Sequence, residues 1–510
     1  MEVFLSGVGM TSFGKKEESL QELMGEAVRA ALEDGNVSAV DAIYVGVMSP
    51  TAFLHEGNFA SLLADFLGMA GKPSVRIETA SSTGAAAFLE AHNAVAADQY
   101  SRVLVVAGEK MSHLSTAETT GILSEVIDRE ERRHGATMPA LAALVAHRYI
   151  HEYQLPLSTF EKLMATIAIK NHGNGLLNPH AHLRKAINEQ QYRDSRMVST
   201  PLRLFDCAPI SDGAAAVLLT SERGDIRIAG IGHGTDTYAI RNRRSLTSFA
   251  STRIAAQKAY RMAHLSPRDI EFAEIHDAFT LLELIGMVDL GFFTPAEARK
   301  AVLKGTTGLH GEFPVNPSGG LKSRGHPVGG SGLAQIVEVA FQLRGAVEEE
   351  RRVKASNIGL AHSVGGLATN TFVTILERSD NKRNLMLEWS SPYRAREEPQ
   401  LAAPPLEVDL HSNTGILESY TVLHTPPEGF PSPLVLGLLR DPSGKRVFAR
   451  GIGQDGLKIN RHVYLKRMGE ITYFTHRSAW HKAKVICRKN YRKYNRRVSS
   501  VVQSLVKKAS

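Results

Sequence analysis

Along the first three-quarters of the chain, short apolar runs alternate with segments in which apolar residues recur at helical spacing. Residues 18–32 carry apolar side chains at intervals of three and four, which predicts an amphipathic helix. The runs at 42–47 (AIYVGV) and 102–107 (RVLVVA) predict strands. The second run is apolar throughout, as expected in a sheet that is covered on both faces. This alternation predicts an α/β fold built on parallel strands.

The segment at 76–91, RIETASSTGAAAFLEA, predicts a strand that runs through a sharp turn of small residues into a tightly packed helix. Ser81 lies at this turn. The first N–H groups of a helix have no partner within the helix and lie at the positive end of its dipole, so they can bind a developing oxyanion. An ordinary serine N-cap is the alternative role, and this segment alone favours it.

The second half of this region repeats the order of the first. ASSTGAAAFLEAHNAVAADQY and the strand RVLVVAG are matched by GHPVGGSGLAQIVEVAFQLRG and KASNIGLAHSVGG. This weak duplication predicts two similar βα halves, residues 1–225 and 226–378, with the chemistry at strand ends where they meet. Residues 112–200 form a looser, more polar excursion that we expect to lie over a substrate pocket.

The pattern changes after residue 378. Residues 379–405 are polar and rich in proline, which predicts a linker. Residues 406–478 carry only short apolar runs with turn signals such as DPSG at 441–444, which predicts a small all-β barrel. Residues 479–510 form a basic tail.

Composition and charge narrow the class of protein. Of the 510 residues, 43% are hydrophobic and 22% charged, as in globular proteins, and no run approaches the roughly 18 apolar residues of a membrane span. The N-terminus has no secretory signal pattern. Two cysteines, Cys207 and Cys487, exclude a disulfide framework and a four-cysteine zinc site. We therefore expect a cytoplasmic protein without a metal site.

The formal charge of +8 comes from the tail, because residues 480–510 hold ten Lys or Arg residues and no Asp or Glu. The rest of the chain is near neutral. Nucleic acid and an anionic membrane are conceivable partners of such a segment. A solvated or protein-docking extension is the better interpretation, so we do not expect nucleic-acid or membrane binding.

A set of motifs in a fixed order resembles the thiolase superfamily, especially its sterol-carrier-protein and archaeal types. The motifs are GVGMTSFGK, ETASSTG, VLVVAGEKM, KNH…NPHA, SDGAAAVLLTS, EIHDAFT, NPSGGLKSRGHPVGGSG and AHSVGG. The resemblance implies a layered αβαβα fold, a homo-dimer or higher oligomer, and coenzyme A thioesters as substrates without a permanently bound cofactor.

The β-rich region is similar to the OB-fold partner domain that often accompanies such enzymes, and GILESYTVLHTPPEGFPSPLVLGLL carries that similarity. Such partners often add a four-cysteine zinc ribbon, which this chain cannot form. A second protein could dock on the OB-fold domain or on the basic tail.

The resemblance also implies roles for individual residues. Ser81 occupies the position of the family's nucleophilic cysteine, whose own N–H contributes to one oxyanion site, and Gly365 supplies the second N–H of that site. His326 deprotonates the nucleophile and helps to bind the thioester oxygen. That oxygen binds at a second oxyanion site, where His276 orients a water. His362 neighbours a motif position without occupying it.

This chain departs from the family where a thiol is expected. Ser363 replaces the cysteine that serves many thiolases as the α-proton base, and Ala278 replaces the cysteine of the sterol-carrier type. Cys207 is better explained as a small buried residue. The resemblance places coenzyme A contacts near four residues, which are Cys207, Ser211, Gly319 and Gly320.

These observations favour C-acyl transfer, by Claisen condensation or thiolysis, although a serine nucleophile should be slow without an adjacent base. Retro-aldol cleavage of a β-hydroxyacyl-CoA needs an enolate site and a base but no acyl-enzyme, and both histidines suit it. A binding or scaffolding subunit without catalytic activity is a third possibility.

Overall fold

The computed structural model describes residues 1–381 and 413–476. Its first half contains five sheet strands in the spatial order β3-β2-β4-β7-β1. These strands are β1 (Phe4–Met10), β2 (Ala42–Gly46), β3 (Ser74–Ile77), β4 (Arg102–Glu109) and β7 (Gly213–Thr220). Strand β2 runs parallel to β3 and β4, whereas β7 runs antiparallel to β4 and β1.

The second half repeats this pairing pattern with the order β8-β11-β10-β9. Its strands are β8 (Ile226–Thr235), β9 (Phe272–Ile275), β10 (Ile358–Gly365) and β11 (Asn370–Arg378). Strand β11 is antiparallel to both neighbours, and β10 is parallel to β9. The expectation of purely parallel halves is therefore wrong, because a buried apolar run carries no information on strand direction.

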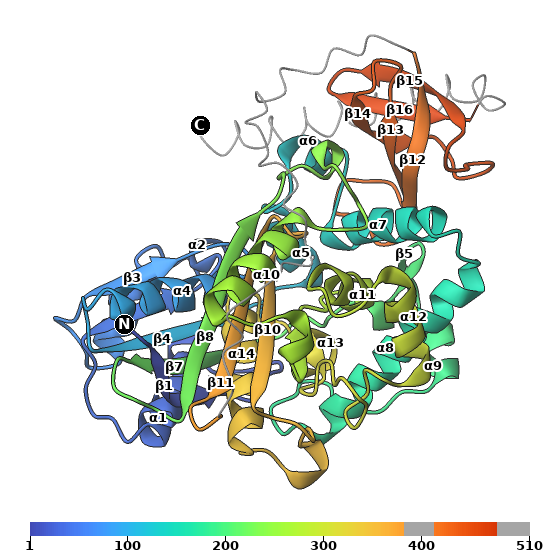
Figure 1. The fold of residues 1–510 in the computed structure, drawn as a ribbon. Helices are drawn as coiled ribbons and strands as arrows, with labels where there is room; N and C mark the ends of the chain where they lie inside the picture. Colours follow the sequence, from blue (N-terminus) through green and yellow to red (C-terminus); the bar gives the residue numbers. More distant parts are fainter. Residues whose placement is uncertain (382–412, 477–510) are drawn as a thin grey trace, which may run out of the picture.

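The two halves join through a short pairing of β1 with β8, in which Phe4 lies opposite Arg227. Helices α4 (Thr83–Ala96) and α14 (Ser331–Arg344) contact each other. Helix α14 contacts strands of both halves, and α4 contacts strands of the first half. Helix α1 (Leu20–Asp34) covers the far face of the first half, and α10 (Ala250–Ala263) covers that of the second. The result is a layered α/β fold (Figure 1).

The excursion between β4 and β7 is mostly helical and packs as a body against the second half. Its elements are α5 (Thr116–Ser124), α6 (Arg129–Arg133), α7 (Met138–Glu152), α8 (Leu157–Leu177), α9 (Glu189–Asp194), β5 (Met197–Ser199), β6 (Leu202–Arg203) and η1 (Leu204–Asp206). The remaining helices are α2 (Pro50–Leu54), α3 (Phe59–Phe66), α11 (Thr280–Asp289), α12 (Pro295–Lys304), α13 (Gly320–Arg324) and the single turns η2 (Ile240–Asn242), η3 (Pro267–Asp269) and η4 (Glu349–Arg351).

The C-terminal region is a five-stranded β-barrel. Its strands are β12 (Thr414–Leu423), β13 (Leu434–Arg440), β14 (Arg446–Gly451), β15 (His462–Met468) and β16 (Ile471–Thr475). They follow the order β13-β14-β16-β15-β12, and a β12–β13 pairing closes the barrel. The all-β prediction is confirmed, while the assignment to the OB-fold stays a prediction. Most of the predicted linker and all of the basic tail lie outside the described residues.

The barrel packs on α7 and on the segment before it (Figure 1). Ser419 Oγ donates to Leu144 O at 2.6 Å, and Arg450 Nε donates to His134 O at 3.0 Å. The Thr472 N–H donates to His134 Nε2 at 3.1 Å. Buried barrel residues such as Leu436 share one apolar cluster with α7 and α8, so the barrel and the excursion form a common core. Within the described ranges, no helix is both long and apolar enough to cross a membrane.

Candidate active site

The turn that carries Ser81 is held by its neighbours and not by Ser81 itself. Ala80 adopts a φ of 57°, a strained value for a residue with a side chain. Ser82 Oγ donates to Thr79 O at 2.7 Å, and Thr83 Oγ1 accepts from Thr79 N at 2.9 Å. Ser82, not Ser81, occupies the N-cap position of α4. The alternative role of Ser81 as an N-cap is therefore wrong, and its half-buried hydroxyl takes no part in holding the turn.

Gly365, the last residue of β10, lies directly against this turn. A Cβ atom at Gly365 would stand 2.2 Å from Thr79 O and 2.6 Å from Ser82 Oγ. No side chain fits at those distances, so the approach of β10 to the Ser81 turn requires glycine. The structure thus brings the two backbone segments of the expected acyl-oxyanion site together.

His276 follows β9 and is 2% exposed. Its Nδ1 accepts a hydrogen bond from Val364 N at 3.3 Å. Burial lowers the pKa of His276 well below 6.5, and the nearby His326, His362 and Arg324 act in the same direction. The ring is therefore neutral, and because Nδ1 is an acceptor, the proton resides on Nε2. His276 is thus a hydrogen-bond donor at Nε2.

His326 has the opposite tautomer. Its Nδ1 lies 2.7 Å from Ser331 Oγ, and that hydroxyl donates its own proton to Pro327 O at 2.9 Å. Ser331 Oγ therefore accepts from Nδ1–H, which leaves a lone pair on Nε2 of His326. Burial, with a smaller effect of Arg324, lowers the pKa of His326 to about 3. Nε2 is thus the nitrogen of this half-buried ring that can accept a proton.

The first turns of α4 and α14 meet beside these groups. A Cβ atom at Gly84 would lie 2.9 Å from both Gly329 O and Leu333 N, so the two helices cross in close contact through small residues. Both N-termini point their positive dipole ends toward the same region. Ser81 and His326, which precede α4 and α14, are therefore brought to one site, although they share no hydrogen bond.

The positions at which the resemblance implies a thiol, Ser81, Ala278 and Ser363, have none. Ser363 is 2% exposed, and its Oγ has no hydrogen-bond partner. Ser363 faces α14, because a Cβ atom at Gly332 would lie 2.4 Å from its Oγ. Cys207 is half-exposed, and burial of its thiol together with the charge of Asp206 raises the pKa to about 12. A thiol with that pKa is not a nucleophile near neutral pH.

Three residues expected near coenzyme A are buried. Ser211 Oγ accepts from His326 N at 3.2 Å and lies 2.8 Å from His182 Nδ1. Gly319 and Gly320 have φ values of 96° and 62°, and a Cβ atom on Gly320 would collide with the carboxylate of Asp277. These residues shape the backbone around the site. A coenzyme A contact remains an expectation for the half-exposed Cys207.

Sequence reasoning missed two residues that position this site. Ser331 fixes the tautomer of His326, and its only sequence signal is its place in the first turn after the GHP motif. Glu109 ends β4 and accepts hydrogen bonds from Met48 N at 2.9 Å and Gly329 N at 3.1 Å. Burial raises the pKa of Glu109 to about 7. The sequence does contain a signal for Glu109, because it is a single acidic residue at the end of an otherwise apolar strand.

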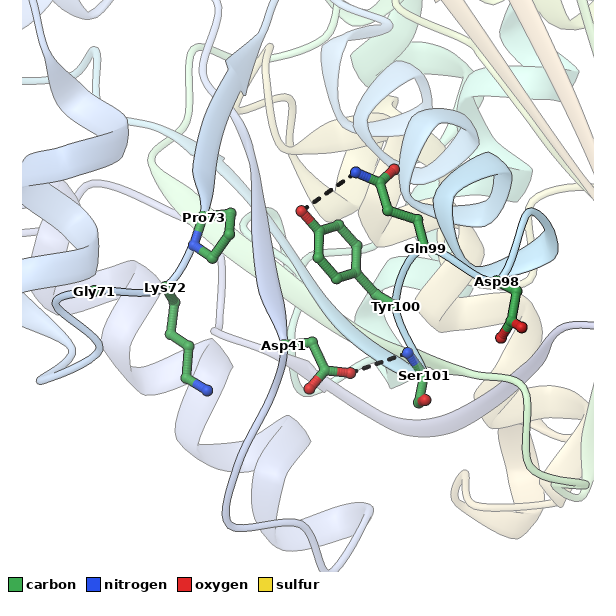
Figure 2. A pocket seen from close by; sticks show the side chains of 8 residues that line it. All are labelled: Asp41, Gly71, Lys72, Pro73, Asp98, Gln99, Tyr100 and Ser101. Atoms are coloured by element: carbon green, nitrogen blue, oxygen red, sulfur yellow. Dashed lines mark hydrogen bonds between the residues drawn. The ribbon is translucent and has the colours of Figure 1, made fainter.

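A polar pocket of about 480 Å³ lies elsewhere, at the start of strands β2, β3 and β4 (Figure 2). Its lining includes Asp41, Lys72, Gln99 and Tyr100, and Asp41 accepts from Ser101 N at 3.0 Å. At the opposite ends of these strands, Ser81 follows β3 and Glu109 is the last residue of β4. The pocket is therefore separated from the site by the length of the strands.

Comparison with known proteins identifies related families. The family model "Thiolase, N-terminal domain" matches residues 3–223, and "Thiolase C-terminal domain-like" matches residues 232–378. The acetyl-CoA acetyltransferase of Methanothermobacter thermautotrophicus is 37% identical over 388 residues, which are 74% of this chain and all of that protein. The benzoylsuccinyl-CoA thiolase subunit BbsB of Thauera aromatica is 32% identical over 377 residues, covering 72% of this chain and 95% of its own.

Among solved structures, a monomeric SCP2-thiolase like protein type 1 from Mycobacterium smegmatis superposes with a TM-score of 0.70 at 16% identity. The alignment covers 92% of this chain and 98% of that chain. At this level of identity the likeness concerns the fold, and its coverage extends beyond the residues that the two family models match.

Proposed function

This chain belongs to the thiolase superfamily, and we propose that it is a C-acyltransferase that joins or splits carbon–carbon bonds next to a coenzyme A thioester. The observation that carries this proposal is that two neighbouring histidines have opposite tautomers. His326 offers a lone pair at Nε2, and His276 offers an N–H at Nε2. A base and an oxyanion donor are the two groups that acyl transfer requires beside its nucleophile.

In the proposed first step, Ser81 Oγ attacks the thioester carbonyl while His326 Nε2 takes its proton. The N–H groups of Ser81 and Gly365 bind the oxyanion, and collapse of the intermediate forms an ester on Ser81. The coenzyme A thiolate leaves and takes the proton from His326. Catalytic hydrogen bonds often close only in the substrate complex, which accounts for the missing Ser81–His326 bond.

In the second step, the acyl group passes from Ser81 to the α-carbon of a second thioester, or back to coenzyme A in the reverse direction. His276 Nε2–H binds the thioester oxygen, directly or through a water, while the enolate forms. Ser363 takes the place of the family's α-proton base, and a hydroxyl is a far weaker base than a thiolate. The same group must return the α-proton in the reverse reaction, so we expect the carbon–carbon bond step to be slow in both condensation and thiolysis.

A second reaction is favoured by the absence of a reactive thiol among the described residues. Retro-aldol cleavage needs no acyl-enzyme: His326 Nε2 takes the proton of the β-hydroxyl, the bond between the α- and β-carbons breaks, and His276 binds the enolate oxygen. Proton return to the α-carbon gives an acyl-CoA and a ketone or aldehyde. This route uses both histidines and leaves Ser81 without a role.

Turnover assays of the full chain and of Ser81→Ala distinguish the reactions. If acyl transfer is correct, thiolysis of 3-ketoacyl-CoA falls at least a hundredfold in Ser81→Ala. Cleavage of β-hydroxyacyl-CoA that survives in Ser81→Ala would instead establish the aldol route. If neither substrate class is turned over while coenzyme A esters still bind, the chain is a binding subunit.

We also propose that the thiolase region forms a homo-oligomer through β3. This strand lies at an edge of the sheet, with β2 as its neighbour among the described strands. Its Val75 is 47% exposed, and an edge strand with an exposed apolar residue is a template for pairing with a second chain. We assign the barrel to the OB-fold and propose that its contact with the excursion stabilises the walls of the acyl site.

A further inference from the structure

A second group of buried polar atoms lies next to the catalytic histidines, between α8, η1 and α13. Lys322 is 2% exposed, and its ammonium lies 5.8 Å from the ring centre of Phe205. No described residue accepts a hydrogen bond from it. An ammonium without an acceptor is costly to bury, so this group is suited to an acceptor that arrives with a ligand.

His172 supplies the complementary atom. This residue is 2% exposed, and its ring packs edge to face on Phe205 with centroids 5.4 Å apart. Its Nδ1 lies 2.9 Å from Lys185 O. Because a carbonyl only accepts, Nδ1 carries the proton, and Nε2 holds a lone pair. This Nε2 atom is buried without a partner.

Lys322 and His172 are close enough for their charges to interact. Burial and the positive charge of Lys322 together lower the pKa of His172 to about 4. The charges of Asp277 and Asp206 also act on Lys322. The pair therefore presents one donor and one acceptor around the Phe205 ring, and no side chain among the described residues hydrogen-bonds to either atom.

The pair is connected to the proposed active site. The backbone N–H of Lys322 donates to Asp277 Oδ2 at 3.3 Å, and Asp277 follows His276. The half-exposed strip at 207–210 begins beside Phe205, and its Ile210 pairs with His326. An acyl chain that lies along this strip from His326 would lead toward Lys322.

We propose that Lys322 and His172 form a specificity subsite for a hydroxyl group on the acyl chain of the coenzyme A ester. One hydroxyl oxygen can accept from the Lys322 ammonium and donate its proton to His172 Nε2, which satisfies both atoms. A carboxylate has only acceptors and would face the His172 lone pair. An unsubstituted alkyl chain would leave both polar atoms unpaired.

Calorimetric titration with unreactive thioether analogues of coenzyme A tests this subsite apart from any reaction. S-hexyl-CoA is compared with a series that carries a hydroxyl at successive carbons of the hexyl chain, and with an analogue that ends in a carboxylate. We expect one hydroxyl position to bind about tenfold or more tightly than S-hexyl-CoA, as a hydrogen bond to a charged group predicts.

Lys322→Met and His172→Phe should each remove this advantage while leaving the affinity for S-hexyl-CoA in place. Lys185→Met is the matched control, because it changes an exposed lysine side chain and keeps the carbonyl that binds His172. Equal binding of all neutral analogues would show that the pair holds only water and would overturn the proposal. Tighter binding of the carboxylate than of every hydroxyl, or an advantage that survives in both variants, would also overturn it.

This subsite rests on the proposed function, which fails if no coenzyme A analogue of the series binds. If the analogues bind without a hydroxyl preference, only the subsite is overturned, so the two failures are distinguishable.

Discussion

His276 and His326 lie edge to face with ring centroids 5.3 Å apart, and separate hydrogen bonds hold them in opposite tautomers. Val364 N–H makes Nδ1 of His276 an acceptor, and Ser331 Oγ makes Nδ1 of His326 a donor. One ring therefore donates and the other accepts at Nε2. This division of roles lets two residues of the same type serve as oxyanion donor and base in one site.

The pH profile of turnover follows from the burial of His326. This residue acts in its neutral form, and because burial lowers its pKa to about 3, the neutral form persists far below the usual histidine range. As the pH falls from about 8 to about 5, kcat/KM should therefore not fall with the titration of an ordinary histidine, whose pKa is about 6.5. A fall centred near that value would contradict the assignment of His326 as the buried base.

Ser331→Ala provides the matched test of the tautomer. Without the Ser331 hydroxyl, the proton of His326 is no longer fixed on Nδ1, and we expect kcat to fall about tenfold or more with little change in KM. An unchanged kcat would show that Ser331 does not position the base. Thermal unfolding of the variant checks that the loss is not a loss of structure.

Gly365→Ala tests the contact between β10 and the Ser81 turn. The added methyl would lie 2.2 Å from Thr79 O, so the turn must move. A displacement on this scale should lower kcat about a hundredfold. The control is Gly121→Ala, since a Cβ atom there meets nothing within 4 Å. Equal activity in both variants would contradict the proposed oxyanion site.

His134 predicts a pH-dependent contribution to stability at the barrel contact. Burial, only partly opposed by the hydrogen bond to Glu130 O, lowers its pKa from 6.5 to about 4 in the folded state. The unfolded chain thus binds a proton more readily, and stability falls as the pH drops from 6.5 toward 4. The expected loss between about pH 7 and about pH 5 is about 2 kcal/mol. Denaturant unfolding at both pH values measures the free energy of unfolding. In His134→Gln its loss between these pH values should be smaller by this amount than in the unsubstituted chain. An identical loss in both proteins would refute the role of His134.

The proposed oligomer is tested at the edge strand. Val75→Lys places a charge on the exposed side of β3 and should convert the assembly to single chains in light scattering after size exclusion. Leu157→Lys is the control, because Leu157 is also an exposed apolar residue, 53% accessible, but lies at the start of α8. If the unsubstituted chain is already monomeric, as the SCP2-thiolase like protein of M. smegmatis is, the proposal is contradicted directly.

Local patterns predicted much of this molecule because the information lies within single segments. The strand at β9 (Phe272–Ile275) and the helix α1 could be recognised from apolar spacing. The positions of Ser81, His276 and His326 at strand-to-helix connections followed from their motifs. The direction of β7 could not be predicted, because an apolar strand looks alike in both directions.

The chemistry of the two histidines was not predictable, because it depends on contacts between distant segments. The tautomer of His276 is set by Val364, which lies 88 residues along the chain. The free acceptor of His172 depends on a carbonyl that no side-chain pattern reveals. The contact of the barrel with α7 could not be predicted either. An Ala-rich helix such as α7 indicates that the helix is buried, but its sequence does not indicate which element packs on it.

The central claim is that Ser81 accepts the acyl group, and intact-protein mass spectrometry after incubation with acyl-CoA and 3-ketoacyl-CoA esters tests it most directly. We predict a mass increase equal to one acyl group, located on Ser81 by peptide mapping and absent in Ser81→Ala. Ser81→Cys should acylate faster, because a thiolate is the better nucleophile. No adduct on the unsubstituted chain, with β-hydroxyacyl-CoA cleavage intact in Ser81→Ala, would contradict acyl transfer and establish the aldol reaction.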